Sequence, residues 1–141
     1  MRSLIVVLLL LPAVGASQQA PPIATKGLDL LVAGQCEAGF RAWTAGWTAP
    51  DDSMKRETLI GTCTVLPQFG KLNGYDIIRV VSVTPNLTRV YVLLRYDLQP
   101  LYLLLVAYRP KDDWKVITVT WNTLPEKVFP PDILPSEHPG P

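Results

Sequence analysis

The sequence predicts an α+β domain, with helices at its N-terminal end laid across one face of a curved antiparallel sheet of about four strands. Apolar and small residues first recur every three or four positions, between residues 25 and 66, as on one side of a helix. From residue 75 onward the period changes to two, in four runs separated by turns of three to five residues. Strands joined by such short turns form an antiparallel meander, and helices that precede all strands indicate an α+β domain.

The N-terminal segment has the three parts of a secretory signal. Arg2 gives a basic start, an unbroken apolar run follows, and small residues end the segment. Signal peptidase requires small side chains one and three residues before its cut, so Ala16 and Val14 place the cleavage before Ser17. The alternative is a membrane anchor, but a spanning helix needs about 20 apolar residues. We therefore expect residues 1–16 to be removed, and the protein to be secreted or periplasmic without a stable membrane span.

Cleavage would leave about 125 residues, the usual size of one domain. We expect a flexible leader at 17–24, a single α+β domain at 25–133 and a disordered proline-rich tail at 134–141. Loss of Arg2 leaves twelve basic and twelve acidic side chains, without a basic cluster. This balance gives no electrostatic basis for binding nucleic acid or anionic lipid.

The first helix is expected over residues 25–47, with Thr25 as a suitable N-cap. Three glycines in this helix each lower its stability by up to about 1 kcal/mol relative to alanine, which suggests that they permit close packing against a flat neighbour. Apolar or small side chains form one stripe along it, at Leu28, Leu31, Val32, Cys36, Phe40, Trp43 and Trp47.

The second helix follows an acidic start at residues 51–52 and is expected to end near Leu66, before Pro67. Cys63 lies on its apolar side, as Cys36 does on the first helix. These are the two cysteines of the chain, and an exported protein keeps disulfides in an oxidising compartment. We expect a Cys36–Cys63 bridge, worth about 3 to 4 kcal/mol in the chain-entropy model. The alternative is two buried free thiols.

Four strands are expected, at residues 75–83, 87–96, 101–108 and 114–121. The third is apolar almost throughout, which is typical of a central strand. Alternation in the fourth strand places Val116 and Trp121 on opposite faces. Alternation in the second strand separates two sets, Val90, Val92, Leu94 and Tyr96 on one face and Arg89, Tyr91, Leu93 and Arg95 on the other.

The stretch from residues 70–75 (GKLNGY) through the later strands to residues 114–116 (WKV) resembles small exported members of the NTF2-like, or cystatin-like, superfamily. The likeness covers about 45 to 60 residues and the helical lead-in. It implies a sheet that curves around a helix to form a conical pocket. The superfamily includes isomerases, dehydratases, transport factors and proteins without assigned activity, so the fold alone does not select a function.

The residues give little support to most common chemistries. Metal sites need clustered ligands, and the single histidine is His138, in the expected tail. The two cysteines lack the C-x-x-C spacing of zinc and thiol redox sites. Common hydrolase and nucleotide-binding motifs are absent from the sequence. We therefore assign no catalytic residue, metal or cofactor.

The sequence favours a ligand-binding site over a catalytic one on the sheet. Tyr91, Arg95 and Trp121 could supply aromatic walls and one fixed charge, the usual composition of a small-ligand pocket. The alternative is a filled core, with Arg95 extending outward to water and Trp121 covering the sheet.

We therefore expect an exported non-catalytic binding or assembly module whose partner is a small ligand or a second copy in a homodimer. One alternative is an isomerase or lyase that pairs Asp97 or Asp76 with Tyr91, Tyr96 or Tyr102 in the cone. Another is an inhibitor or partner-capping protein that presents a sheet edge or the exposed sheet face, including by self-association.

Overall fold

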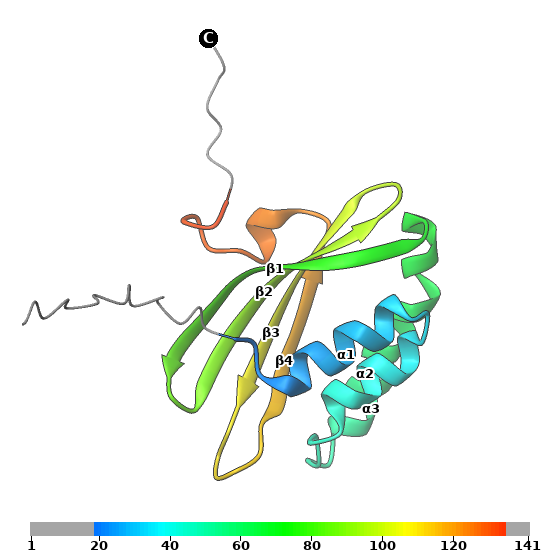
Figure 1. Ribbon diagram of the computed structural model, residues 1–141. Helices are drawn as coiled ribbons and strands as arrows, with labels where there is room; N and C mark the ends of the chain where they lie inside the picture. Colours follow the sequence, from blue (N-terminus) through cyan, green and yellow to red (C-terminus); the bar gives the residue numbers. More distant parts are fainter. Residues whose placement is uncertain (1–18, 135–141) are drawn as a thin grey trace, which may run out of the picture.

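The computed structural model describes residues 19–134. The helices form a layer against one face of the sheet (Figure 1), which confirms the predicted α+β arrangement. The predicted signal peptide, residues 1–16, and the predicted tail beyond residue 134 lie outside the described residues. The helices and strands are α1 (Pro22–Val32), α2 (Cys36–Thr44), α3 (Asp52–Ile60), β1 (Leu72–Thr84), β2 (Leu87–Tyr96), β3 (Pro100–Tyr108) and β4 (Lys115–Asn122). Short 3-10 segments are η1 (Gly61–Thr64), η2 (Leu66–Phe69) and η3 (Pro125–Lys127).

The single helix expected over residues 25–47 is two helices, α1 and α2, separated at Gly34. Gly34 has a φ of 79°, a left-handed conformation that glycine adopts without the steric cost of a Cβ. Its amide donates to the carbonyl of Leu31 at 3.0 Å, and the Gln35 amide donates to the carbonyl of Leu30 at 2.9 Å. These bonds end α1. The apolar spacing continues across the break because both helices turn their apolar sides to the same core.

The start of α1 also differs from the prediction. The helix begins at Pro22, so the segment expected as a flexible leader, residues 17–24, overlaps it. Proline suits a first helical position because its φ is already helical and its missing amide would have no partner there. Thr25 is not the N-cap, since its hydroxyl donates to the Pro22 carbonyl at 3.1 Å.

Glycines allow α1 and α2 to pack closely. A side chain at Gly27 would overlap the indole of Trp43, and a Cβ at Gly39 would lie 2.9 Å from the Gly27 carbonyl oxygen. The Trp43 indole N–H donates to the Ala24 carbonyl at 3.1 Å, and Trp43 is 1% exposed. The close packing predicted for the three glycines is confirmed for Gly27 and Gly39, whose neighbours belong to the other helix. It is not confirmed for Gly34, which among residues 19–134 has no atom beyond its chain neighbours within 4 Å of a Cβ position and instead ends α1.

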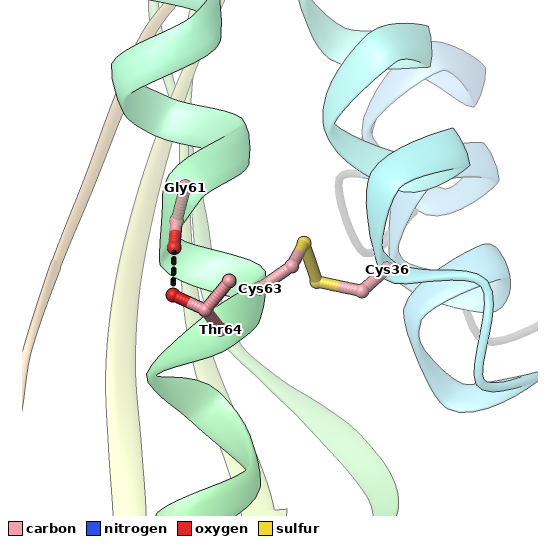
Figure 2. Close-up of a disulfide and its surroundings, with 4 residues drawn as sticks. All are labelled: Cys36, Gly61, Cys63 and Thr64. Carbon is pink, nitrogen blue, oxygen red and sulfur yellow. Dashed lines mark hydrogen bonds between the residues drawn. A yellow bond between two sulfur atoms is a disulfide. The ribbon is translucent and has the colours of Figure 1, made fainter.

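The predicted Cys36–Cys63 disulfide is present (Figure 2), with an S–S distance of 2.05 Å and a Cα–Cα distance of 5.9 Å. It joins the first residue of α2 to η1. The helix expected to run to residue 66 changes at Gly61 from α-helix to 3-10 turns. Figure 2 shows the Thr64 hydroxyl donating to the Gly61 carbonyl, at 2.8 Å, within this tighter segment.

The sheet is the predicted antiparallel meander, with strand order β1-β2-β3-β4. β1 and β4 are therefore its two edges. β1 contains three register irregularities against β2, each leaving one residue of β1 unmatched, at Asn73, Ile78 and Val83. β4 contains one against β3, at Ile117. Such bulges bend a strand and interrupt its regular row of backbone groups.

The main core lies between the helices and the inner face of the sheet. The alternation of side chains predicted for β2 is confirmed on this inner face, where Val90, Val92 and Leu94 are buried. In β4 the prediction was wrong: Val116 and Trp121 both face the core, because the extra residue Ile117 shifts the alternation by one. Other large buried members of this core are Leu28, Phe40, Trp43, Leu101, Leu103 and Leu105.

The outer face of the sheet carries a second apolar cluster. The C-terminal segment after β4 brings Val128 and Phe129 onto Tyr91, which is 4% exposed. The Phe129 ring lies edge-on to Tyr91, with centroids 5.6 Å apart, and to Tyr102, with centroids 5.3 Å apart. We call this group the outer cluster. The outer cluster therefore buries the Tyr91 side chain, which is not available on the open surface of the sheet.

Candidate functional site

The structure does not bring the three predicted ligand-binding residues together. Tyr91 belongs to the outer cluster, and exposed Arg95 pairs with Asp76 through an Nε–Oδ2 distance of 3.4 Å. Trp121 lies on the opposite face, where it packs against the main core. Its register partner on β3 is Leu103, a fully buried core residue. The sheet itself therefore separates Trp121 from the other two side chains.

The interior between helices and sheet is filled. The space enclosed there measures about 10 Å³, about the volume that one water molecule requires. Phe40, Trp43 and Trp121 are among the side chains that border it. The open conical pocket implied by the resemblance is therefore replaced, in the part of the chain that the structure describes, by a packed core.

A larger concavity lies between α3 and the edge strand β4. Its wider part has a volume of about 500 Å³, and it continues into a narrower part of about 320 Å³ that shares Trp47 and Lys55 with it. We call both parts together the α3–β4 groove. The wider part is lined by Trp47, Met54, Lys55, Thr58, Leu59, Thr62, Val119 and Trp121. The narrower part is lined by Gly46, Trp47, Thr48, Ala49, Asp52, Lys55, Lys115 and Ile117.

Several hydrogen bonds position the groove wall that follows α2. The Trp47 indole N–H donates to the Val116 carbonyl of β4 at 2.7 Å. From α3, the Arg56 guanidinium donates to the carbonyls of Thr44 at 2.9 Å and Trp47 at 2.7 Å. A cation that binds the last carbonyls of a helix both satisfies them and complements the negative end of its dipole. α2, α3 and β4 are thereby linked around the groove.

The charges of the groove gather at its narrower part. Lys55 lies 3.1 Å from Asp51 and 3.8 Å from Asp52. The hydrogen bond between Lys55 and Asp51 raises the pKa of the lysine and lowers the pKa of the aspartate. Lys115 has no ion pair among residues 19–134, and its Nζ lies 5.9 Å from the Tyr108 ring centroid. Lys115 therefore lines the narrower part as a cation without a paired carboxylate from this part of the chain, and its ammonium lies toward Tyr108, which is not part of that lining.

The wider part of the groove is predominantly apolar. Met54 is 69% exposed although it is a large apolar side chain. It faces Val119 and Trp121 across the groove as part of the same lining. Sequence reasoning missed Met54 and Trp47 as site residues. A methionine within an otherwise charged and polar turn of helix, residues 51–57, was the available signal.

The acid–base pair required by the isomerase alternative is not assembled. Asp76 and Asp97 are both exposed, and they interact with Arg95 and with Asn73, whose Nδ2 donates to Asp97 at 2.6 Å. Tyr96 packs against Phe69, and burial raises its pKa. Neither carboxylate is held in a concavity beside a tyrosine hydroxyl, as general acid–base catalysis would require.

A different tyrosine–aspartate pair does form. The Tyr75 hydroxyl donates to Asp29 at 2.8 Å and joins β1 to α1. Burial, followed by this hydrogen bond, raises the pKa of Tyr75 to about 12. A phenol with so high a pKa is a poor proton donor or acceptor near neutral pH, so the pair serves to connect the helix layer to the sheet edge.

The described residues were also searched for a metal site and for a membrane-spanning helix. Residues 19–134 contain no group of three or more histidine, cysteine, aspartate or glutamate side chains able to hold a metal ion. His138 lies outside that range. The same residues contain no helix that is long and apolar enough to cross a membrane.

Fold and site together define an α+β domain with a filled core and an open, largely apolar groove beside an edge strand. Comparisons of the chain with protein-family models, with curated proteins and with solved structures found no match. The function proposed below is therefore based on the geometry and lining of the α3–β4 groove.

Proposed function

We propose that the protein is an exported, non-catalytic binding module of NTF2-like type that holds a small apolar ligand in the α3–β4 groove. The observation that carries the proposal is the wider part of the groove, whose volume of about 500 Å³ falls within the usual range of small-molecule sites. The helix layer on a four-stranded meander supports the fold type, and the signal-like N-terminal sequence supports export.

The lining indicates what the ligand should be. Trp47 and Trp121 supply aromatic surface, Met54 supplies an adaptable apolar one, and few polar groups interrupt them. Ligand sites commonly combine such apolar walls with a small number of polar groups that fix orientation. Lys115, in the narrower part, is such a group. The favoured ligand is therefore aromatic or aliphatic, with at most one anionic end directed toward Lys115.

Titration with the uncharged fluorophore N-phenyl-1-naphthylamine tests this proposal. We expect saturable fluorescence enhancement with the unmodified protein, and an affinity at least about tenfold lower for Met54→Lys, because a charge would then have to be desolvated against the apolar wall. Ser53→Lys adds the same charge one position away, outside the groove lining, and should bind normally. Absence of saturable binding, or equal binding by both variants, would overturn the proposal.

A further inference from the structure

The two edges of the sheet differ in a way that bears on assembly. β1 carries three bulges, at Asn73, Ile78 and Val83, and the charged side chains Asp76 and Arg79. β4 carries one bulge, at Ile117, after which its pairing with β3 is regular from residue 118 to residue 122. Natural edge strands are commonly protected against pairing by bulges and charges. β1 has both forms of protection, whereas residues 118–122 have neither.

Composition makes this part of β4 well suited to pairing. Residues 118–122 (TVTWN) contain no charge, no proline and no glycine, and they are rich in β-branched and aromatic side chains. The Trp47 indole reaches β4 at Val116, before the bulge. Among residues 19–134, no hydrogen bond from outside the sheet reaches a backbone group of residues 118–122. An edge strand of this kind has unpaired amides and carbonyls available to another strand.

We propose that two copies of this chain pair antiparallel along residues 118–122 of β4, forming one continuous eight-stranded sheet from two four-stranded ones. The segment is self-complementary. Pairing centred on Thr120 places Val119 opposite Trp121 of the second copy, on the face that bears the groove, and Thr118 opposite Asn122 of the second copy, on the outer face. Apolar side chains thus oppose apolar ones, polar side chains oppose polar ones, and like charges do not meet.

The difference between the edges also explains why assembly should stop at two. A twofold pairing uses the same edge of both copies, so the edges left at the ends of the dimer sheet are the two protected β1 strands. Were both edges of the monomer regular, pairing could continue into a fibre. One protected and one unprotected edge therefore favour a closed dimer.

Dimerisation would also place the second copy near the groove. β4 contributes one wall of the α3–β4 groove and, within residues 19–134, has no neighbouring strand on its free edge, so the second copy's β4 would run beside that wall. The features of β4 that favour pairing involve no ligand, so the dimer does not depend on the proposed binding function. If both hold, the second copy's β4 lies beside each groove.

Sedimentation-velocity analysis of the purified protein over about 1 to 100 μM tests the dimer. We expect a dimer, and for Thr120→Lys a dimer dissociation constant raised at least about tenfold, because two ammonium groups would meet at the twofold axis. Thr120 is exposed on the outer face, so the monomer should keep its fold, which circular dichroism checks. Val83→Lys, on the protected edge, is the matched control and should remain dimeric.

The results of these experiments distinguish the dimer from ligand binding in the groove. An unmodified protein that is monomeric throughout, a Thr120→Lys variant as dimeric as the unmodified protein, or disruption by Val83→Lys would each overturn the dimer. Slower amide hydrogen exchange of residues 118–122 at higher protein concentration would support it independently. A monomeric protein that still binds N-phenyl-1-naphthylamine would refute the dimer and leave the groove's function intact.

Discussion

The indole nitrogen of Trp47 lies 2.7 Å from the carbonyl oxygen of Val116, to which it donates a hydrogen bond across 69 positions of sequence. This bond attaches the loop after α2 to the beginning of β4. The bond lies beside the bulge at Ile117, after which the pairing of β4 with β3 is regular. One residue therefore forms a wall of the α3–β4 groove and fastens the strand that forms the opposite wall.

Replacing Trp47 by phenylalanine should separate these two roles. The ring remains apolar, but the Val116 carbonyl loses its donor, so we expect the free energy of unfolding to fall by about 1 to 2 kcal/mol. Urea denaturation followed by circular dichroism measures the change. Trp114→Phe is the control, because Trp114 interacts with Arg109 through its ring, and a much smaller loss is expected there. Equal losses would contradict the role given to the Trp47 bond.

The disulfide should contribute substantially to stability. Cys36 and Cys63 are 27 positions apart and join α2 to η1, so opening the bond frees a long loop in the unfolded chain. We expect the double variant Cys36→Ser/Cys63→Ser to lose about 3 to 4 kcal/mol of unfolding free energy. Dithiothreitol should produce a similar loss in the unmodified protein and no change in the double variant. Insensitivity of the unmodified protein to dithiothreitol would contradict this expectation.

The pair formed by Tyr75 and Asp29 predicts a dependence of stability on alkaline pH. The tyrosine has a pKa of about 12 in the folded protein and 10 as its ordinary value. Below pH 10 both states keep the proton and the contribution is fully present. Between pH 10 and pH 12 the unfolded state releases a proton that the folded state retains, so the free energy of unfolding falls as pH rises. Tyr75→Phe should flatten this decline, whereas Tyr108→Phe should not.

The outer cluster should hold the C-terminal segment to the sheet. Phe129 contacts both Tyr91 and Tyr102 and is 6% exposed, so Phe129→Ala should cost about 3 kcal/mol of unfolding free energy. Limited proteolysis should then cut residues 123–134 faster. Leu124→Ala, at a residue that is 48% exposed, should change stability by less than about 0.5 kcal/mol. Similar proteolysis of both variants would argue against a holding role for Phe129.

Much of the fold could be predicted because its signals are local. The period of two in residues 87–96 identified β2 with the observed limits, Leu87–Tyr96, and turn residues marked the ends of the neighbouring strands. The inward positions of Cys36 and Cys63 predicted the disulfide. These features depend on residues a few positions apart, which is the range that hydrophobic spacing reports.

The candidate site could not be predicted in the same way. Gly34 breaks one apolar stripe into two helices without interrupting its spacing, and the extra residue at Ile117 changes which side of β4 faces the core. The bulge moves Trp121 to the inner face, so it lies away from Tyr91. The groove depends on how α3 sits relative to β4, an arrangement set by contacts between segments far apart in the sequence.

The most direct test of the central claim is the location of the bound probe. We would record amide and indole chemical shifts of the isotopically labelled protein by NMR during titration with N-phenyl-1-naphthylamine. The α3–β4 groove predicts saturable shifts centred on Met54, Thr58, Val119 and the Trp121 indole. Shifts centred on Tyr91 and Arg95 on the opposite face, or no saturable shifts, would contradict the account.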